Sequence, residues 1–327
     1  MAEVGVTTIG RNEGDRLRRC LQSALRTNPL VIYVDSASSD RSVETARALG
    51  VSVVETDRST PLGPSRARNA GFARLLDLDP TIKFIQFVDG DCELTEGWIE
   101  AAIRRLQSDP QIAIVCGRLR ERFPTASIYN QLCEIEWDQP VGESLACGGI
   151  FMIRVEAFRQ VGGFDPEVFA GEDAELCVRL RSKGWKILRV DSEMAVHDAA
   201  MTRFGQWWRR AIRCGYAYAH GSSLHGGSPD RHYVRDTRLV WFWGFLVPVI
   251  SVGAAWPSRA TSLLLLLIYP AQFCRMYRRG RARPLSRATA AGYALSCILC
   301  RFAQIYGVWR FIVDRLRGAP IRLIEHR

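Results

Sequence analysis

Two aspartates separated by one glycine follow a short apolar segment in the first third of the chain. The segment FIQFV predicts a strand buried on both faces, and Asp89-Gly90-Asp91 places two carboxylates where it ends. Like charges this close repel each other, and burying them unpaired is costly. A divalent cation removes the repulsion, because Mg²⁺ or Mn²⁺ is usually held by one or two carboxylates together with substrate phosphates. A solvated turn that caps a helix over 95–107 is the alternative for this motif alone.

Further acids and one histidine could complete such a site. Asp35 ends the second predicted strand, where a carboxylate can accept hydrogen bonds from a base or a ribose. Glu172 and Asp173 begin an amphipathic helix, so one can act as a general base while the other orients it, or both can simply complement the helix dipole. His197 follows an extended segment and is either a third metal ligand or a structural histidine.

Basic residues at a helix start favour phosphate binding. Arg66, Arg68 and Asn69 lie in GPSRARNAG, where backbone N–H groups and the helix dipole also attract anions. Solvated arginines on a surface helix are the alternative. Only Gly10 and Gly14 follow the first strand, so the G-x-G-x-x-G pattern of dinucleotide-binding dehydrogenases is missing and that class is disfavoured.

Apolar strand-like runs alternate with helical patterns through the first two hundred residues. The pattern predicts an α/β fold with a mostly parallel sheet covered by helices on both faces. In such sheets ligands bind at the carboxyl ends of the strands, where Asp35 and Asp89 lie. The expected strands cover Val4–Ile9, Leu30–Val34, Val51–Glu55 and Phe84–Val88, and the expected helices cover Glu13–Leu25, Arg41–Leu49 and Ser65–Leu76.

The composition changes after residue 238. Two uncharged runs, 239–256 and 260–274, precede an arginine cluster over 275–287. A membrane-spanning helix needs roughly 20 apolar residues, so the first run qualifies marginally and the second falls short. The pair predicts a transmembrane, re-entrant or interfacial hairpin, with two buried helices of a soluble domain as the alternative. Interfacial tryptophans and the arginines favour the membrane. The stretch 288–313 is typical of an amphipathic helix lying in the membrane plane.

The net charge of +10 and the pI near 9.3 predict an anionic partner. The densest arginine cluster flanks apolar runs without base-stacking aromatics between them, which favours membrane lipids and argues against nucleic acid. Ten cysteines without framework spacing, and an opening stretch unlike an export signal, predict a catalytic region that faces the cytosol.

The order of the motifs resembles family 2 glycosyltransferases with the GT-A fold, over roughly residues 3 to 220. TTIGRNE, VDSASSD, GPSRARNAG, FVDGD, ACGGIFMIRVEAFRQVGGFD and GEDAELCVRLRSKGW occur in that order before a late histidine. The resemblance implies a nucleoside diphosphate sugar donor, with Asp173 as the catalytic base beside Glu172. It implies Asp91 and His197 as metal ligands, and Gly148 and Gly149 as part of the acceptor pocket. The implied donor-binding residues are Thr8, Arg11, Glu13, Asp35, Arg68, Asp89 and Asp91.

One later segment, FGQWWRRAIRCG, is similar to the Q-x-x-R-W element of membrane polysaccharide synthases. Gln206 and Arg209 match it and are implied to lie on the acceptor side, whereas Arg210 stands where tryptophan is expected. That departure argues against processive synthesis.

These features together predict a glycosyltransferase domain over 1–225 and a membrane-associated helical region over 226–327. The expected reaction is inverting, metal-dependent transfer to a lipid-linked or glycan hydroxyl at the cytosolic membrane face, with no obligate protein partner. A nucleotidyltransferase would carry a glycine-rich, lysine-containing loop after its first strand. A phosphatase with an aspartyl nucleophile would carry its DxD motif on the first strand. A non-catalytic membrane-bound scaffold remains the third alternative.

Overall fold

The structure, a computed structural model, describes residues 3–26, 29–56 and 63–318. The chain forms two compact units, Met1–Phe123 with Cys133–Ala200, and Pro124–Leu132 with Met201–Arg327. The division falls at residue 200, whereas the sequence patterns placed a boundary at 225. The difference is helix α8 (Phe204–His225), which packs along helix α12 (Arg287–Leu316) of the second unit.

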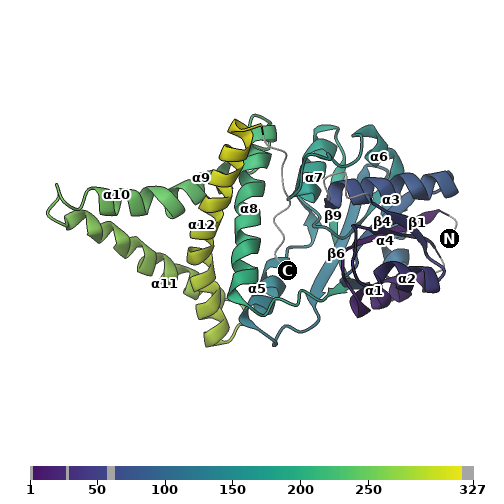
Figure 1. Ribbon diagram of the computed structural model, residues 1–327, viewed down its shortest axis with the longest axis horizontal. Coiled ribbons are helices and arrows are strands. Elements are labelled where there is room, and N and C mark those ends of the chain that lie inside the picture. The colour runs from purple at the N-terminus through teal and green to yellow at the C-terminus, as the bar shows by residue number, and fades with distance from the viewer. Residues whose placement is uncertain (1–2, 27–28, 57–62, 319–327) are drawn as a thin grey trace. The chain divides into compact units, whose positions relative to one another are not determined.

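The first unit alternates strands and helices as expected (Figure 1). Helix α5 (Ile128–Trp137) begins in the second unit and ends in the first. The strands are β1 (Val4–Gly10), β2 (Leu30–Asp35), β3 (Ser52–Glu55), β4 (Phe84–Asp89), β5 (Cys92–Leu94), β6 (Ile112–Glu121), β7 (Gly142–Glu143), β8 (Phe151–Arg154) and β9 (Lys186–His197). The helices are α1 (Asp15–Leu25), α2 (Ser42–Ala48), α3 (Pro64–Leu78), α4 (Trp98–Ser108), α6 (Val155–Gln160) and α7 (Glu172–Ser182).

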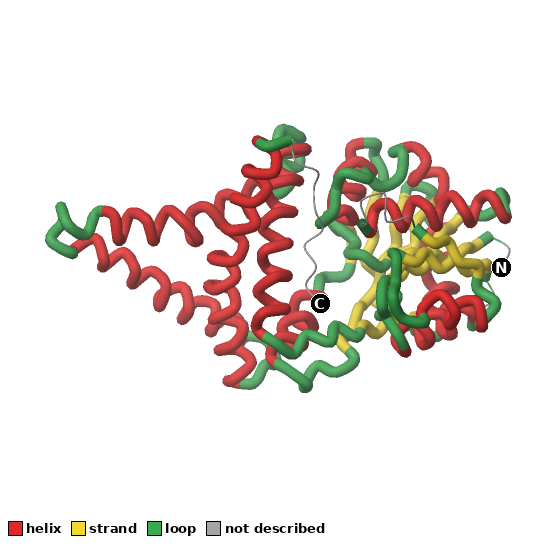
Figure 2. Tube along the Cα trace, in the orientation of Figure 1, coloured by secondary structure: helices red, strands yellow, loops and turns green. Residues whose placement is uncertain are grey.

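These strands form one mixed sheet that is mostly parallel, in the order β3-β2-β1-β4-β8-β6-β9-β5, with β7 paired to β9. Strands β3, β2, β1 and β4 run parallel, β8 is antiparallel to both its neighbours, and β6 and β9 are again parallel. The strands lie between helices on both faces (Figure 2). The predicted α/β fold with a mostly parallel sheet is therefore confirmed.

The alternation of side chains along β1 shows which face of the sheet α1 and α3 cover. A Cβ on Gly71 of α3 would lie 2.2 Å from the Thr7 methyl group, whereas the Thr8 hydroxyl lies 4.0 Å from Cys20 Sγ of α1. Because neighbouring strand residues point to opposite faces, α1 and α3 cover opposite sides of the sheet. Gly71 is required here, since any larger side chain would push α3 off β1.

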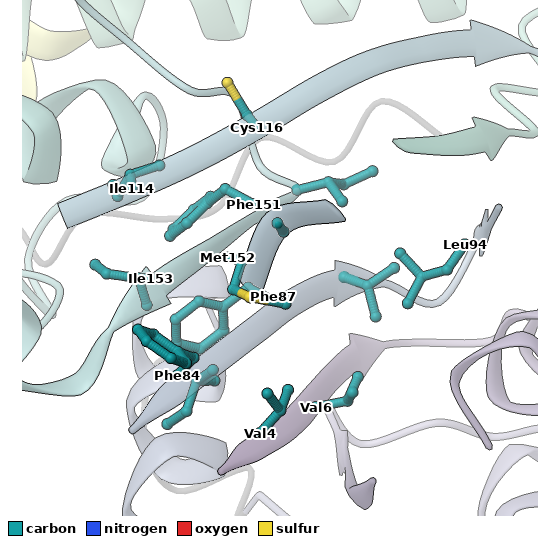
Figure 3. Packing of buried hydrophobic residues seen from close by; sticks show 14 of the residues in the cluster. Val4, Val6, Phe84, Phe87, Leu94, Ile114, Cys116, Phe151, Met152 and Ile153 are labelled. Atoms are coloured by element: carbon teal, nitrogen blue, oxygen red, sulfur yellow. The ribbon is translucent and has the colours of Figure 1, made fainter. Parts of the chain in front are cut away.

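Strand β4 is buried on both faces, as its apolar sequence predicts. Phe87 packs against the rings of Phe151, Phe158 and Phe164, with centroids 5.4–5.7 Å apart. Figure 3 shows Phe87 and Phe151 within this cluster. Burying an aromatic side chain of this size contributes about 1.5–3 kcal/mol. The core therefore holds the end of β4, and the acids that follow it, in a fixed position.

The second unit is helical in its described part (Figure 2). Helix α8 lies against α12 with their backbones in contact, because a Cβ on Gly215 or Gly307 would lie 2.0 Å from a carbonyl oxygen of the facing helix. Its remaining elements are α9 (Val234–Trp241), a π-helical turn η1 (Phe242–Leu246), α10 (Val247–Gly253), a 3₁₀ helix η2 (Thr261–Leu267) and α11 (Ile268–Arg281).

The apolar runs fold into two irregular helical segments. Pro248 has no N–H to donate to the carbonyl four residues before it, and the π turn directly precedes it. The helix long and apolar enough to cross a membrane, within the described residues, is instead α12, and 28% of its apolar window is buried inside the unit. Helix α12 is thus a weak indication of membrane association.

Candidate functional site

The Asp89-Gly90-Asp91 turn sits where β4 leaves the sheet beside the end of β1. Gly90 donates its N–H to Ile9 O at 2.8 Å, and a Cβ on Gly90 would lie 3.2 Å from both that oxygen and Glu13 Cγ. The glycine therefore lets the chain pass close to β1. The two carboxylates diverge into different surroundings, because the side chain of Asp89 is 34% exposed and that of Asp91 is 3% exposed.

Asp91 faces His197 across the pairing of β5 with β9. Cys92 and His197 are register partners, and Asp91 Oδ2 lies 3.1 Å from His197 Nε2. With Cys92 Sγ these atoms form a cluster within 4.8 Å, which could hold a metal ion. Burial raises the pKa of the Cys92 thiol well above its ordinary value. The predicted pair, Asp91 and His197, is thus brought together.

A buried glutamate behind His197 was not anticipated from the sequence. Glu121, the last residue of β6, has a carboxylate oxygen 3.8 Å from His197 Nδ1. The carboxylate accepts N–H groups from Phe123 and Ala199, and the edge of the Trp137 ring meets the imidazole. Its position at a strand end, the same signal as that of Asp89, could have drawn attention to it. These contacts hold the imidazole with Nε2 toward Asp91.

Arg68 joins the aspartate turn to the helix that carries the other acids. It is 2% exposed, donates from Nη1 to Glu172 Oε1 at 2.7 Å, and donates from Nη2 to Asp89 Oδ1 at 2.8 Å. Nη2 also lies 3.2 Å from Gly149 O, and the guanidinium stands over the Phe164 ring at 5.5 Å. A solvated surface arginine is excluded at this position. The pairing instead balances the charges of the buried Glu172 and the partly exposed Asp89.

Glu172 and Asp173 form the first turn of α7, after Gly171 in the left-handed conformation at φ 73°. Glu172 is buried and bound to Arg68, whereas Asp173 is partly exposed. Burial, and next the Glu172 carboxylate, raise the pKa of Asp173 to about 6, while Arg68 and the backbone N–H groups of Asp173 and Ala174 oppose the rise. A carboxylate with this pKa is ionised at neutral pH yet more basic than usual, as a general base requires.

Comparison with known proteins assigns this arrangement to a family. The model described as Glycosyl transferase family 2 matches residues 6–162, and the model described as Glycosyl transferase family group 2 matches residues 137–306. The chain belongs to the family 2 glycosyltransferases.

Curated relatives agree with this assignment. The chain is 26% identical to the pre-mycofactocin glycosyltransferase of Mycobacterium tuberculosis over 324 residues, which cover 91% of this chain and 64% of the relative. The chain thus spans less than two thirds of the length of that relative.

Solved structures show the same fold. The mannosyltransferase PcManGT from Pyrobaculum calidifontis, in complex with GDP-Man and Mn²⁺, superposes with a TM-score of 0.59 at 17% identity, over 96% of this chain and 88% of that one. TarS from S. aureus gives a TM-score of 0.50 at 12% identity, over 93% and 55% of the two chains. The predicted GT-A fold is thereby confirmed.

The loops after β1 and β2, which hold predicted donor-binding residues, are tied together. Asp35 accepts hydrogen bonds from the Tyr33 hydroxyl at 2.7 Å and from the N–H and hydroxyl of Ser38 at 2.8 and 2.6 Å. Asn12, which the sequence analysis did not single out, accepts the Ser39 N–H at 2.7 Å and so links the loop after β1 to the loop after β2. Its positive φ of 57° marks it as a constrained turn residue.

The remaining predicted donor residues differ in accessibility. Thr8 is fully buried in β1, where its hydroxyl lies 4.0 Å from Cys20 Sγ. Glu13 is mostly buried and pairs with Arg16 at 3.0 Å, with its side chain over Gly90. Arg11 is exposed in the same loop.

The predicted acceptor residues lie in different units. Gly149 borders the acid site, because a Cβ there would lie 3.0 Å from Arg68 Nη2, and Gly148 before it has a φ of 79° that favours glycine. Gln206 and Arg209 belong to α8 of the second unit. Gln206 Oε1 accepts the N–H groups of the two residues that precede α8, Thr202 and Arg203, and so caps the helix, whereas Arg209 is exposed. The structure thus gives Gln206 a local structural role.

Proposed function

We propose that this chain catalyses inverting transfer of a sugar from a nucleoside diphosphate sugar to an acceptor hydroxyl, with a bound Mg²⁺ or Mn²⁺. The observation that carries the proposal is the continuous contact from Asp89 through Arg68 to Glu172, next to Asp173. It holds a base with a raised pKa in a fixed relation to the aspartate turn at the end of β4.

The residues around Asp91 fit a divalent cation. A carboxylate and a neutral imidazole nitrogen at 3.1 Å are ligand types that Mn²⁺ accepts, and Mg²⁺ uses such carboxylates together with substrate phosphates. When bound there, the ion would neutralise charge that develops on the departing diphosphate. Asp89 keeps a third of its side chain exposed and remains available to the donor.

Asp173 is the group that accepts the proton. The acceptor oxygen forms its bond to the anomeric carbon while the bond from that carbon to the diphosphate oxygen breaks, and the hydroxyl proton passes to the Asp173 carboxylate. Glu172 is unsuited to this step, because one of its oxygens already accepts the Arg68 N–H at 2.7 Å. Its role is to hold Arg68 and to raise the basicity of Asp173.

We further propose that Asp35 binds the nucleobase or ribose, and that the acceptor is a lipid-linked or membrane-proximal glycan at the cytosolic face. The exposed apolar side chains of the second unit and its arginine cluster support a membrane-proximal acceptor. The names of the similar proteins supply GDP-mannose as a first donor and pre-mycofactocin as one acceptor to include in a screen.

The test is release of nucleoside diphosphate by the purified full chain with Mn²⁺ and a panel of activated sugars. Asp173→Asn should retain donor binding by calorimetry and lose about 10²–10⁴-fold in transfer rate. Asp91→Ala should weaken Mn²⁺-dependent nucleotide binding, whereas the exposed Asp77→Asn should change neither quantity. Near-normal turnover of Asp173→Asn would refute the base, and retained anomeric configuration would refute inversion. Release of inorganic diphosphate from a nucleoside triphosphate mixed with a sugar 1-phosphate would instead indicate a nucleotidyltransferase.

A further inference from the structure

The apolar segments of the second unit form a hairpin with an unusual surface. Residues 239–274 are here called the apolar hairpin. Its first leg is the end of α9, η1 and α10, and its second leg is η2 and α11 up to Cys274; α10 and α11 extend away from α12 and approach each other at the turn between the legs (Figure 1). Its large apolar side chains face outward: Val252 is 65% exposed, Leu264 65% and Trp256, at the turn, 94%. Burying so much contiguous apolar surface requires a partner.

The hydroxyl groups of the hairpin are satisfied internally. Every serine, threonine and tyrosine hydroxyl between 239 and 274 donates to a backbone carbonyl of the hairpin itself; these are Ser251, Ser258, Thr261, Ser262 and Tyr269. Two of these bonds, Ser262 to Ser251 O and Tyr269 to Trp243 O, join one leg to the other. Water would solvate such groups without internal partners, whereas hydrocarbon demands that they be paired.

Charge is confined to the two ends of the hairpin. Arg238 and Arg275 bracket it at the base, and Arg259 at the turn is its one charged residue. The first leg, about 18 residues at 1.5 Å each, is about 27 Å long, close to the roughly 30 Å of a bilayer's hydrocarbon core. If the base lies at one headgroup layer, Arg259 therefore reaches the other layer, instead of standing in the middle of the hydrocarbon, where a guanidinium is costly.

Helix α12 meets the length and hydropathy criteria for a membrane-spanning helix, but α8, which packs against it, carries an arginine beside the contact. Ile212 of α8 touches Gly307 of α12, so the adjacent Arg213 would stand within the hydrocarbon if α12 crossed it. Arg301 and Arg310 of α12 itself would also lie there. The charged residues of this helix pair are compatible with a position at the membrane surface, beside the headgroups.

We infer that the apolar hairpin crosses a lipid bilayer, with the turn at 256–260 in the far headgroup layer and α8 and α12 along the near surface. The arginines after Cys274 bind anionic headgroups at the base, with the charge complementarity that such lipids offer. The inference rests on the proposed function, because a crossing hairpin would hold the catalytic unit at the membrane where the acceptor is proposed to lie. Its test needs no sugar donor, so the crossing and the proposed reaction can fail separately.

Cysteine accessibility tests the crossing. The two variants are Ala260→Cys at the turn and Ala282→Cys beyond the base, and both replace an exposed alanine. Each full chain is expressed in bacterial cells, and the spheroplasts are treated with a membrane-impermeant maleimide. Ala260→Cys should be labelled from outside, and Ala282→Cys only after lysis, with the parent chain as background for Cys274. Labelling of Ala260→Cys only after lysis, or under neither condition, would overturn the crossing.

Partitioning onto lipid vesicles tests whether lipid covers the apolar hairpin. Leu264→Glu should lower the partition coefficient onto phosphatidylcholine–phosphatidylglycerol vesicles by about 100-fold, because a charge is placed in hydrocarbon. Leu78→Glu, an exposed leucine of α3, should leave it unchanged. Unaltered vesicle binding by Leu264→Glu, together with conversion of a dimer to a monomer in sedimentation, would show that a second copy covers the hairpin and would overturn the inference.

Discussion

Asp173→Asn is expected to stabilise the fold while it removes the proposed base. Burial, followed by the Glu172 carboxylate, raises the pKa of Asp173 from 3.8 to about 6 in the folded chain. The folded state therefore favours the protonated carboxyl, and above pH 6 the ionised group costs folding free energy. The cost is absent below the unfolded pKa, grows between pH 3.8 and about 6, and is complete at neutral pH.

The magnitude follows from the same shift. One pKa unit corresponds to about 1.4 kcal/mol, so the interval from 3.8 to about 6 gives an upper value of about 3 kcal/mol. Because Asp173 is partly exposed, solvent screening reduces this to about 1–3 kcal/mol. Asparagine keeps the shape and the hydrogen-bonding capacity of the side chain without its charge, so the variant should recover most of that free energy.

Thermal unfolding of the detergent-solubilised full chain, followed by tryptophan fluorescence, measures the effect. A gain of about 1–3 kcal/mol corresponds to a Tm higher by about 2–10 °C at neutral pH for a unit of this size. Near pH 4 the difference should vanish, and Asp77→Asn, which removes an exposed acid of α3, should have no effect at either pH. An unchanged or lower Tm for Asp173→Asn at neutral pH, or an equal gain at both pH values, would refute the reasoning.

Four further outcomes are expected around the same site. Glu172→Gln should move the acid limb of the pH–rate profile to lower pH, because the Glu172 carboxylate raises the pKa of Asp173; an unmoved limb would separate the two groups. Arg68→Met should destabilise the fold by about 3–5 kcal/mol in urea unfolding, and added Glu172→Gln should restore part of it; additive losses would contradict a shared pair. Gly149→Ala should lower the transfer rate by a larger factor than it lowers the stability of the fold, since the new Cβ would lie 3.0 Å from Arg68 Nη2. His197→Ala should weaken Mn²⁺ binding measured by calorimetry, because it removes the imidazole beside Asp91.

The acids of the site were predictable because each carries a local signal. Asp89 and Asp91 directly follow a continuous apolar strand, and Glu172 and Asp173 open an amphipathic helix. Parallel strands bring their carboxyl ends to one edge, so the strand-end acids could be placed together without coordinates. The α/β order of the first unit was predictable for the same reason, since alternation and short loops leave few topologies.

The partners of Arg68 were not predictable in the same way. Its position at a helix start favoured a phosphate ligand, but Glu172 lies 104 residues further along the chain, and only the tertiary fold decides that the two side chains meet. Glu121 was missed because a strand-end glutamate among arginines is an ordinary surface pattern until β6 and β9 pair. The compact units divide after residue 200 and the predicted boundary lies at 225, because no composition change separates α8 from the sheet and α8 packs against α12 through backbone contacts at Gly215 and Gly307.

The two neighbouring aspartates avoid mutual repulsion because their side chains turn to different partners. Asp91 turns inward to His197, which a cation suits, and Asp89 turns to Arg68, which already neutralises it. Because Arg68 also binds Glu172, any donor that competes for Asp89 acts on the same guanidinium that lowers the pKa of Asp173. If the donor binds Asp89 and Asp173 is the base, as proposed, donor binding and base strength are coupled through one buried cation, and the pH–rate profile should differ between the free protein and the donor complex.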